Sequence, residues 1–236
     1  MRFIKLNTKL NTFHLKLLAL FFMVIDHVAT FFIPISSPDY FAMRIVGRIA
    51  APLFWFCFAE GFRHTSNRLN YICRLGIAAG IMGIVNEVLV YLFDISSTFS
   101  AYKPNIFLTM FFMAIAILLF EKVFATESNL IATGSLLLGI ATSVLAGFIC
   151  EYGWFAVTSI LFFYFIKHKA WKLTLFGVSC VIISLLEPFY IQLFMILSIF
   201  PMAFYSNEKP KHGWKWFFYV FYPAHIWILV ILSSLI

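Results

Sequence analysis

Residues 15–33 read LKLLALFFMVIDHVATFFI, and the ionisable side chains in this run are Lys16, Asp26 and His27. A helix needs roughly 20 mostly apolar residues to cross the hydrocarbon core of a bilayer. Basic residues precede the run, as in a secretory signal peptide, but the run ends in Asp26-His27 without a small-residue cleavage site. We therefore predict that this stretch is retained as a first transmembrane helix.

Further apolar segments follow at 43–62, 72–92, 105–121, 130–149, 152–166, 173–187, 189–205 and 216–235. Of the 236 residues, 63% are hydrophobic and 11% are charged, whereas soluble domains are about 45–50% apolar and about 25% charged. A soluble core of this size has too little volume to bury so much apolar surface. The sequence thus predicts one all-α domain over residues 1–236, a polytopic bundle of about nine transmembrane helices.

The distribution of lysine and arginine predicts how these helices are oriented. With a cytoplasmic N-terminus, 14 of the 17 basic residues fall on the inner side and 3 on the outer side. The inner residues are Arg2, Lys5, Lys9, Lys16, Arg63, Arg68, Arg74, Lys122, Lys167, Lys169, Lys172, Lys209, Lys211 and Lys215, and the outer ones are Arg44, Arg48 and Lys103. Because cytoplasmic loops carry an excess of basic residues, the N-terminus is predicted inside and the C-terminus outside.

The formal charge of +7 and the pI of about 9.3 would suggest nucleic-acid binding in a soluble protein. In a membrane protein, basic loops set the topology and contact anionic lipid, so we predict membrane lipid and no nucleic acid as a partner. The four cysteines show no metal or redox spacing, and the six histidines show no ligand spacing. No metal site is therefore predicted.

Ionisable residues at membrane depth cost several kcal/mol unless they are paired or hydrated, so they are the natural candidates for function. One group is expected in the outer half of the bundle: Asp26, His27, Arg44, Arg48, Glu87, Glu151, Glu187 and His225. A second group is expected at the inner surface, around the connection between the second and third helices: Glu60, Arg63, His64, Arg68 and Arg74.

The first predicted helix extends from the inner group of ionisable residues to the outer group. Lys16 and His27 are eleven residues apart, which is about three turns and about 16 Å along the axis, so they share one face. Asp26 points roughly 100° away from His27 and need not be its partner. Arg44 and Arg48, at the start of the second predicted helix, are four residues apart and share a face.

Each candidate also has a structural interpretation. His27 would be an interfacial imidazole in water, and His225, which follows Pro223, would be a hydrogen-bonded histidine at a helix kink. Glu87 would be a structural partner of one of the arginines. The outer arginines would anchor their helix to lipid headgroups, and the inner arginines would only mark the cytoplasmic side.

Several stretches resemble the TraX family, whose named member acetylates the N-terminus of F-type conjugative pilin. The specific part is LKLLALFFMVIDH (15–27) followed by GRIAAPLFWFCFAEGFRHT (47–65) and RLNYICRL (68–75). Shorter pieces agree in order: NIFLT (105–109), EYGWFAV (151–157) and FYVFYPAHI (218–226). The resemblance covers nearly the whole chain, and Glu151 stands where the family pattern has aspartate.

A more distant similarity concerns membrane acyltransferases that O-acetylate bacterial surface glycans. These enzymes carry a basic residue, ten intervening positions and a histidine on their first helix, which is the spacing of Lys16 and His27. The basic residue is usually arginine, so the lysine is a departure from the pattern. The glycine- and phenylalanine-rich second helix, followed by Arg68 and Arg74, has a similar layout.

These resemblances imply an acetyltransferase of the bacterial cytoplasmic (inner) membrane that uses acetyl-CoA as co-substrate. His27 would be the general base, since histidine has a suitable pKa. A carboxylate, Asp26 or Glu87, would orient it, and His225 is a second candidate acid or base. Arg44 or Arg48 would stabilise the thioester oxyanion. Direct transfer is favoured over an acyl-enzyme, because no serine or cysteine lies beside a base.

Binding of acetyl-CoA would require cations at the inner face, where its phosphates arrive from the cytoplasm. The residues assigned to this role are Lys16, Arg63, His64, Arg68 and Arg74. The acceptor would be an amine or hydroxyl, on a pilin or a surface glycan. Two alternatives stay open: a membrane transporter or channel, since charges at membrane depth also mark solute pathways, and a non-catalytic factor for conjugation or secretion assembly.

Overall fold

The computed structural model describes residues 9–93, 105–186, 190–208 and 214–235. Lys103 and Glu187 of the predicted outer side lie outside these ranges, as do Arg2, Lys5, Lys209 and Lys211 of the predicted inner side. The described residues form helices and no β-strand; their one extended pairing is an isolated bridge between Leu10 and Tyr205. The all-α prediction is confirmed.

The helices lie where the apolar segments predicted them. In chain order they are α1 (Thr12–Phe32), α2 (Pro38–Gly47), α3 (Ala50–His64), α4 (Arg68–Phe93), α6 (Ile106–Ala125), α7 (Asn129–Ile149), α8 (Gly153–Phe165), α9 (Lys169–Leu186), the 3₁₀ helix η2 (Ile191–Ser198), α10 (Ile199–Ala203) and α11 (Lys215–Ser233). Within the described ranges, seven segments are long and apolar enough to cross a membrane, with α2 and α3 counted as one. The other two, α8 and η2 with α10, are shorter. The chain is therefore a multi-pass membrane protein.

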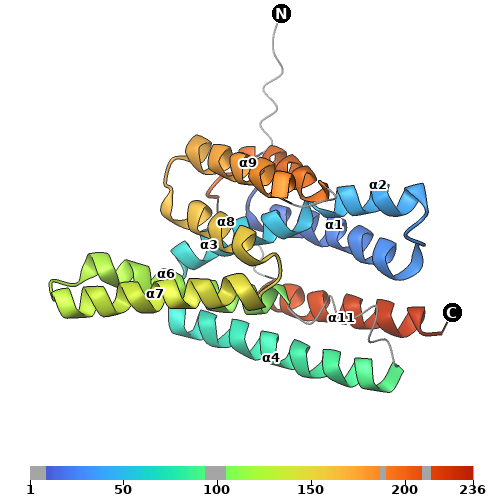
Figure 1. Cartoon of the computed structure of the whole chain (residues 1–236), viewed down its shortest axis with the longest axis horizontal. Coiled ribbons are helices and arrows are strands. Elements are labelled where there is room, and N and C mark those ends of the chain that lie inside the picture. Colours follow the sequence, from blue (N-terminus) through green and yellow to red (C-terminus); the bar gives the residue numbers. More distant parts are fainter. Residues whose placement is uncertain (1–8, 94–104, 187–189, 209–213, 236) are drawn as a thin grey trace, which may run out of the picture.

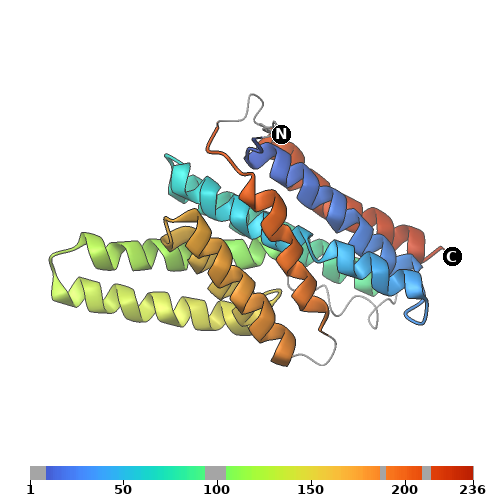
Figure 2. The ribbon, with the colours of Figure 1, turned by 90° about the horizontal axis from the view of Figure 1, so that it is seen from above.

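Side-chain contacts show the relative directions of the helices. Phe13 packs on Trp214 and His27 lies beside His225, so α1 and α11 run parallel. Cys57 of α3 reaches the carbonyl of Thr12 at the start of α1, whereas Ala50 lines the same cavity as His27 near the end of α1, so α3 runs antiparallel to α1. Figure 2 shows α1 and α11 side by side, and both Figure 1 and Figure 2 show the α6–α7 hairpin extending away from them. The C-terminal ends of α1 and α11 therefore lie on the same side of the bundle. This agrees with the prediction that the N-terminus is inside and the C-terminus outside.

The second predicted helix is longer than expected and is broken in the middle. It begins at Pro38, with Ser37 as N-cap, rather than at residue 43, and it is interrupted at Arg48 and Ile49. Pro52 explains the break, because it has no N–H to donate to the carbonyl of Arg48 and its ring clashes with that carbonyl. Arg44 and Arg48 therefore lie at the C-terminal end of α2, inside the bundle, and not at the start of a helix.

Gly47 allows α2 to pack closely against α1. A Cβ atom at this position would lie 2.3 Å from the Cβ of Asp26 and 2.3 Å from its Oδ1. Both contacts are too short for real atoms, and the Asp26 Cβ cannot move without its backbone. The glycine therefore determines how near the arginines of α2 come to Asp26.

We expect Gly47→Ala to lower the free energy of unfolding by about 1–3 kcal/mol, because overpacking forces the backbone to shift. Gly80→Ala is the matched control: a Cβ there meets nothing within 4 Å, so alanine should raise that free energy by roughly 0.5–1 kcal/mol. Unfolding in detergent micelles measures both. Equal changes in the two variants would contradict the close approach of α2 and α1.

Candidate functional site

Asp26 is the centre of a buried ion cluster between α1 and α2. Arg44 Nη1 donates to Asp26 Oδ2 at 2.6 Å and to Thr30 Oγ1 at 2.9 Å. Arg48 Nη2 donates to both carboxylate oxygens, each at 2.9 Å, and Arg48 is 4% exposed. The two arginines therefore share one carboxylate, and neither is a headgroup anchor.

His27 lies on another face of α1 and contacts α11. Its Nδ1 is 2.7 Å from His225 Nε2, and His225 Nδ1 is 3.0 Å from the carbonyl oxygen of Phe221. A carbonyl only accepts, so His225 carries its proton on Nδ1. With both rings neutral, His225 Nε2 then accepts from the Nδ1–H of His27. The nitrogen of His27 without a proton is consequently Nε2, and Nδ1 contacts an imidazole, where sequence reasoning expected a carboxylate beside His27.

His27 lines a small cavity of about 30 Å³ between α1, α3 and the turn before α8. Other polar residues in its wall are Asp26, Glu151 and Tyr152. A larger cavity of about 340 Å³ lies between α1, α3, α4, α6 and α11. The two cavities adjoin, because Phe54, Ile106 and Tyr222 line both.

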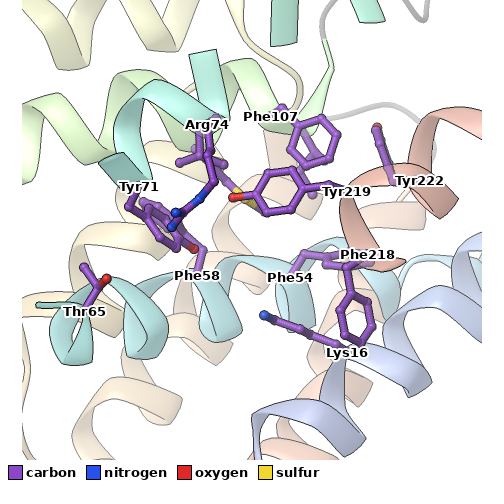
Figure 3. Close-up of a pocket in the computed structure, with 13 residues that line it drawn as sticks. Lys16, Phe54, Phe58, Thr65, Tyr71, Arg74, Phe107, Phe218, Tyr219 and Tyr222 are labelled. Atoms are coloured by element: carbon purple, nitrogen blue, oxygen red, sulfur yellow. The ribbon is translucent and has the colours of Figure 1, made fainter. Parts of the chain in front are cut away.

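Two cations extend into the larger cavity from opposite sides. Figure 3 shows Lys16 extending from α1 and Arg74 extending from α4, with Thr65 on the far side of Tyr71 from Tyr219. Lys16 Nζ lies 5.3 Å from the ring centre of Phe218, and Arg74 lies 5.6 Å from that of Tyr71. Among the described residues neither cation has a carboxylate partner, and the buried Nε of Arg74 has no hydrogen-bond acceptor.

Arg63 lies outside this cavity, in a separate ion cluster around the buried Glu60. Arg63 Nη1 is 2.7 Å from Glu60 Oε1, and Lys172 Nζ is 2.9 Å from the same oxygen. Both cations also donate to the carbonyl of Phe163, at 2.9 and 3.1 Å, and Arg63 donates to that of Tyr164 as well. These are the last carbonyls of α8, so this cluster caps a helix C-terminus.

The remaining candidates lie apart from both cavities. Arg68 pairs with Glu121 and donates to Tyr164 Oη at 3.3 Å, which ties α4 to α6 and α8. The His64 side chain is 61% exposed and its Nε2 is 4.0 Å from Glu60 Oε2. Glu87 is exposed on α4 and lines neither cavity.

The turn between α7 and α8 contributes Glu151, which sequence reasoning placed in the outer group without a specific role, and Tyr152, which it did not consider. Tyr152 lines the small cavity and has φ +60°, and Gly153 follows with φ +46°. Burial raises the pKa of the neighbouring Glu151 to about 7. The sequence carries a signal for this turn, because Glu151-Tyr152-Gly153 combines a carboxylate, a phenol and a glycine at the junction of two apolar segments.

Comparison with known proteins identifies the family. The profile described as TraX protein matches residues 12–233. The chain belongs to the TraX family. A relative from Dichelobacter nodosus, described as "Probable fimbrial assembly protein FimC, serogroup H1", is 27% identical over 237 residues, which cover 94% of this chain and 96% of the relative. No solved structure matches this TraX-family chain significantly.

The TraX resemblance drawn from the sequence is thereby confirmed. Within the described ranges of this TraX protein, no group of three or more His, Cys, Asp and Glu side chains is placed to hold a metal ion.

Proposed function

We propose that this TraX protein is an integral membrane acetyltransferase of the bacterial inner membrane, which moves an acetyl group from cytoplasmic acetyl-CoA to an amine or hydroxyl. The observation that supports this most is the adjacency of the two cavities. One is lined by two cations without carboxylate partners among the described residues, and the other is lined by His27, whose imidazole contacts His225. An anionic co-substrate with a long, thin arm suits this arrangement.

In this proposal Lys16 and Arg74 hold the phosphates of acetyl-CoA. Guanidinium and ammonium groups bind phosphate through charge-assisted hydrogen bonds. The buried Nε–H of Arg74, which has no acceptor among the described residues, is a donor available for this purpose. The aromatic wall of the cavity suits the less polar stem of the molecule, which would extend past Phe54 and Tyr222 toward His27.

The transfer needs a base at the thioester end. The acceptor nitrogen or oxygen attacks the thioester carbonyl carbon while His27 Nε2 takes its proton. The carbonyl π electrons move to oxygen, then return as the carbon–sulfur bond breaks with its electron pair on sulfur. The imidazolium of His27 returns the proton to the thiolate, so the products are acetylated acceptor and free CoA. His225 keeps Nε2 as the basic nitrogen by accepting from Nδ1–H.

The name of the Dichelobacter nodosus relative favours a pilin as acceptor, although a surface glycan uses the same chemistry. That name also supports a second candidate function, a non-catalytic factor in fimbrial assembly. The two functions differ in one observable. The enzyme releases CoA when acetyl-CoA and acceptor are present, whereas the assembly factor is required for fimbriae but releases none.

The proposal is tested by CoA release and acetyl-CoA binding with the purified protein in lipid nanodiscs. We expect wild-type protein to do both, and Lys16→Ala/Arg74→Ala to weaken binding by about 100-fold or more, since each charged contact contributes about 1.5–3 kcal/mol. The control removes two exposed inner cations, Lys122→Ala/Lys167→Ala, and should bind like wild type. Equal affinity in the two double variants would contradict this placement of the co-substrate.

A further inference from the structure

Tyr152 lies in the turn between α7 and α8. The fold holds its backbone in a conformation that few residues other than glycine adopt. Its φ of +60° lies in the left-handed region, where a bulky residue is uncommon. Such conformations persist when the surroundings determine them, and they concentrate at functional sites. Here the result is that the tyrosine lines the small cavity together with His27.

The position of the Tyr152 ring is fixed from two sides. Trp55 packs against it edge to face, with ring centres 5.3 Å apart and an interplanar angle of 78°. The Arg48 guanidinium lies 5.7 Å from its ring centre, and Arg48 itself is held by two hydrogen bonds to Asp26. The hydroxyl is thus attached to a rigid framework that extends back to α1.

The hydrogen bonding of the hydroxyl leaves its proton available. Arg48 Nη1 donates to Tyr152 Oη at 3.2 Å, so in this contact the oxygen is the acceptor. Over the residues that the structure describes, Oη accepts this bond and donates none. The ordinary pKa of a phenol is about 10, so Tyr152 carries its proton at neutral pH. The neighbouring guanidinium also polarises the O–H bond toward donation.

We propose that Tyr152 is a catalytic residue, the hydrogen-bond donor to the thioester oxyanion, with Arg48 as its positioning residue. This rests on the proposed acetyl transfer. When the acceptor attacks, the carbonyl π electrons move to oxygen, and the Tyr152 O–H donates to that oxygen until the carbon–sulfur bond breaks. The proton stays on Tyr152 throughout, because His27 carries the proton of the acceptor. Donors placed in advance where charge develops stabilise the transition state most.

This assignment differs from the one made from sequence, in which Arg44 or Arg48 contacts the oxyanion directly. Neither arginine lines the small cavity, and both are committed to Asp26. Their charge reaches the cavity through the phenol of Tyr152. If Tyr152 were only structural, it would make the same contacts with Trp55 and Arg48, but loss of its hydroxyl would not slow the chemical step.

The test is the steady-state kinetics of CoA release by Tyr152→Phe, which keeps the ring and its packing. We expect kcat to fall by about 100-fold or more, as for the loss of one oxyanion donor, with KM for acetyl-CoA and thermal stability near those of wild type. Tyr190→Phe is the control: Tyr190 has φ +49° and is 58% exposed, and its kcat should not change.

Three outcomes overturn the assignment, and they are distinguishable. If the wild type is active and Tyr152→Phe keeps the wild-type kcat, the hydroxyl is not a donor to the oxyanion. If kcat, KM and thermal stability all worsen together, Tyr152 is a structural residue. If wild-type protein releases no CoA with any acceptor, the acetyltransferase proposal itself fails, and the role of Tyr152 fails with it.

Discussion

His27→Ala is expected to lower the rate of CoA release by about 10²–10⁴-fold, the usual contribution of a general base. Acetyl-CoA should still bind, because Lys16 and Arg74 line the other cavity. Lys16 is also about three helical turns from His27 along α1. Single-turnover CoA release and equilibrium binding separate the two effects. Binding of acetyl-CoA by the variant at wild-type affinity will show that it is folded.

Two further histidine variants make this result specific. His225→Ala removes the acceptor for the Nδ1–H of His27, so the rate should fall, but less than in His27→Ala. His168→Ala changes an exposed histidine between α8 and α9 and should have no effect. A wild-type rate in His27→Ala would remove the imidazole from the mechanism.

Asp26→Asn is expected to lower the free energy of unfolding by about 3–5 kcal/mol, because it leaves two guanidinium groups in the bundle without their counter-charge. The amide offers one acceptor oxygen where the carboxylate accepts from Arg44 and twice from Arg48. Unfolding in detergent micelles, followed by circular dichroism, measures the loss.

Asp39→Asn is the matched control for this charge removal. Asp39 is exposed in the first turn of α2, where it interacts with the helix dipole, an effect of about 0.3–1 kcal/mol. A similarly small effect at Asp26 would show that Arg44 and Arg48 are hydrated or paired elsewhere, contrary to the ion cluster described above.

The apolar segments were predictable because burial in lipid requires long uninterrupted runs, and each run produced a helix. The break at Arg48 was not predicted, although Pro52 was visible, because a proline four residues after a position can either kink a helix or be tolerated. That break moves Arg44 and Arg48 from the expected helix start into the bundle. Their buried pairing with Asp26 follows from it.

Which cations are paired could not be read from sequence. Arg68 and Arg74 are both basic residues near the inner face, yet six residues on a helix correspond to a rotation of about 240° between them. Arg68 consequently meets Glu121 of α6, and Arg74 faces α11 and the cavity. The rotation is calculable from the sequence, but the helix that lies on each face is a property of the fold.

The pairing of His27 with His225 could not be predicted from the sequence either. The separation of Asp26 and His27 on α1 was expected from their spacing, and the two side chains do contact different helices. That α11 would bring His225 to within 2.7 Å of His27 depends on contacts between residues 198 positions apart. No local pattern contains that information.

The central claim is that a cytoplasmic thioester reaches the histidine pair through the adjoining cavities. It is tested most directly by a cryo-electron microscopy structure of the full chain in nanodiscs with CoA bound. We predict that the phosphates lie between Lys16 and Arg74 and that the thiol sulfur lies beside His27. CoA density outside the larger cavity, or a sulfur remote from His27, would contradict the account.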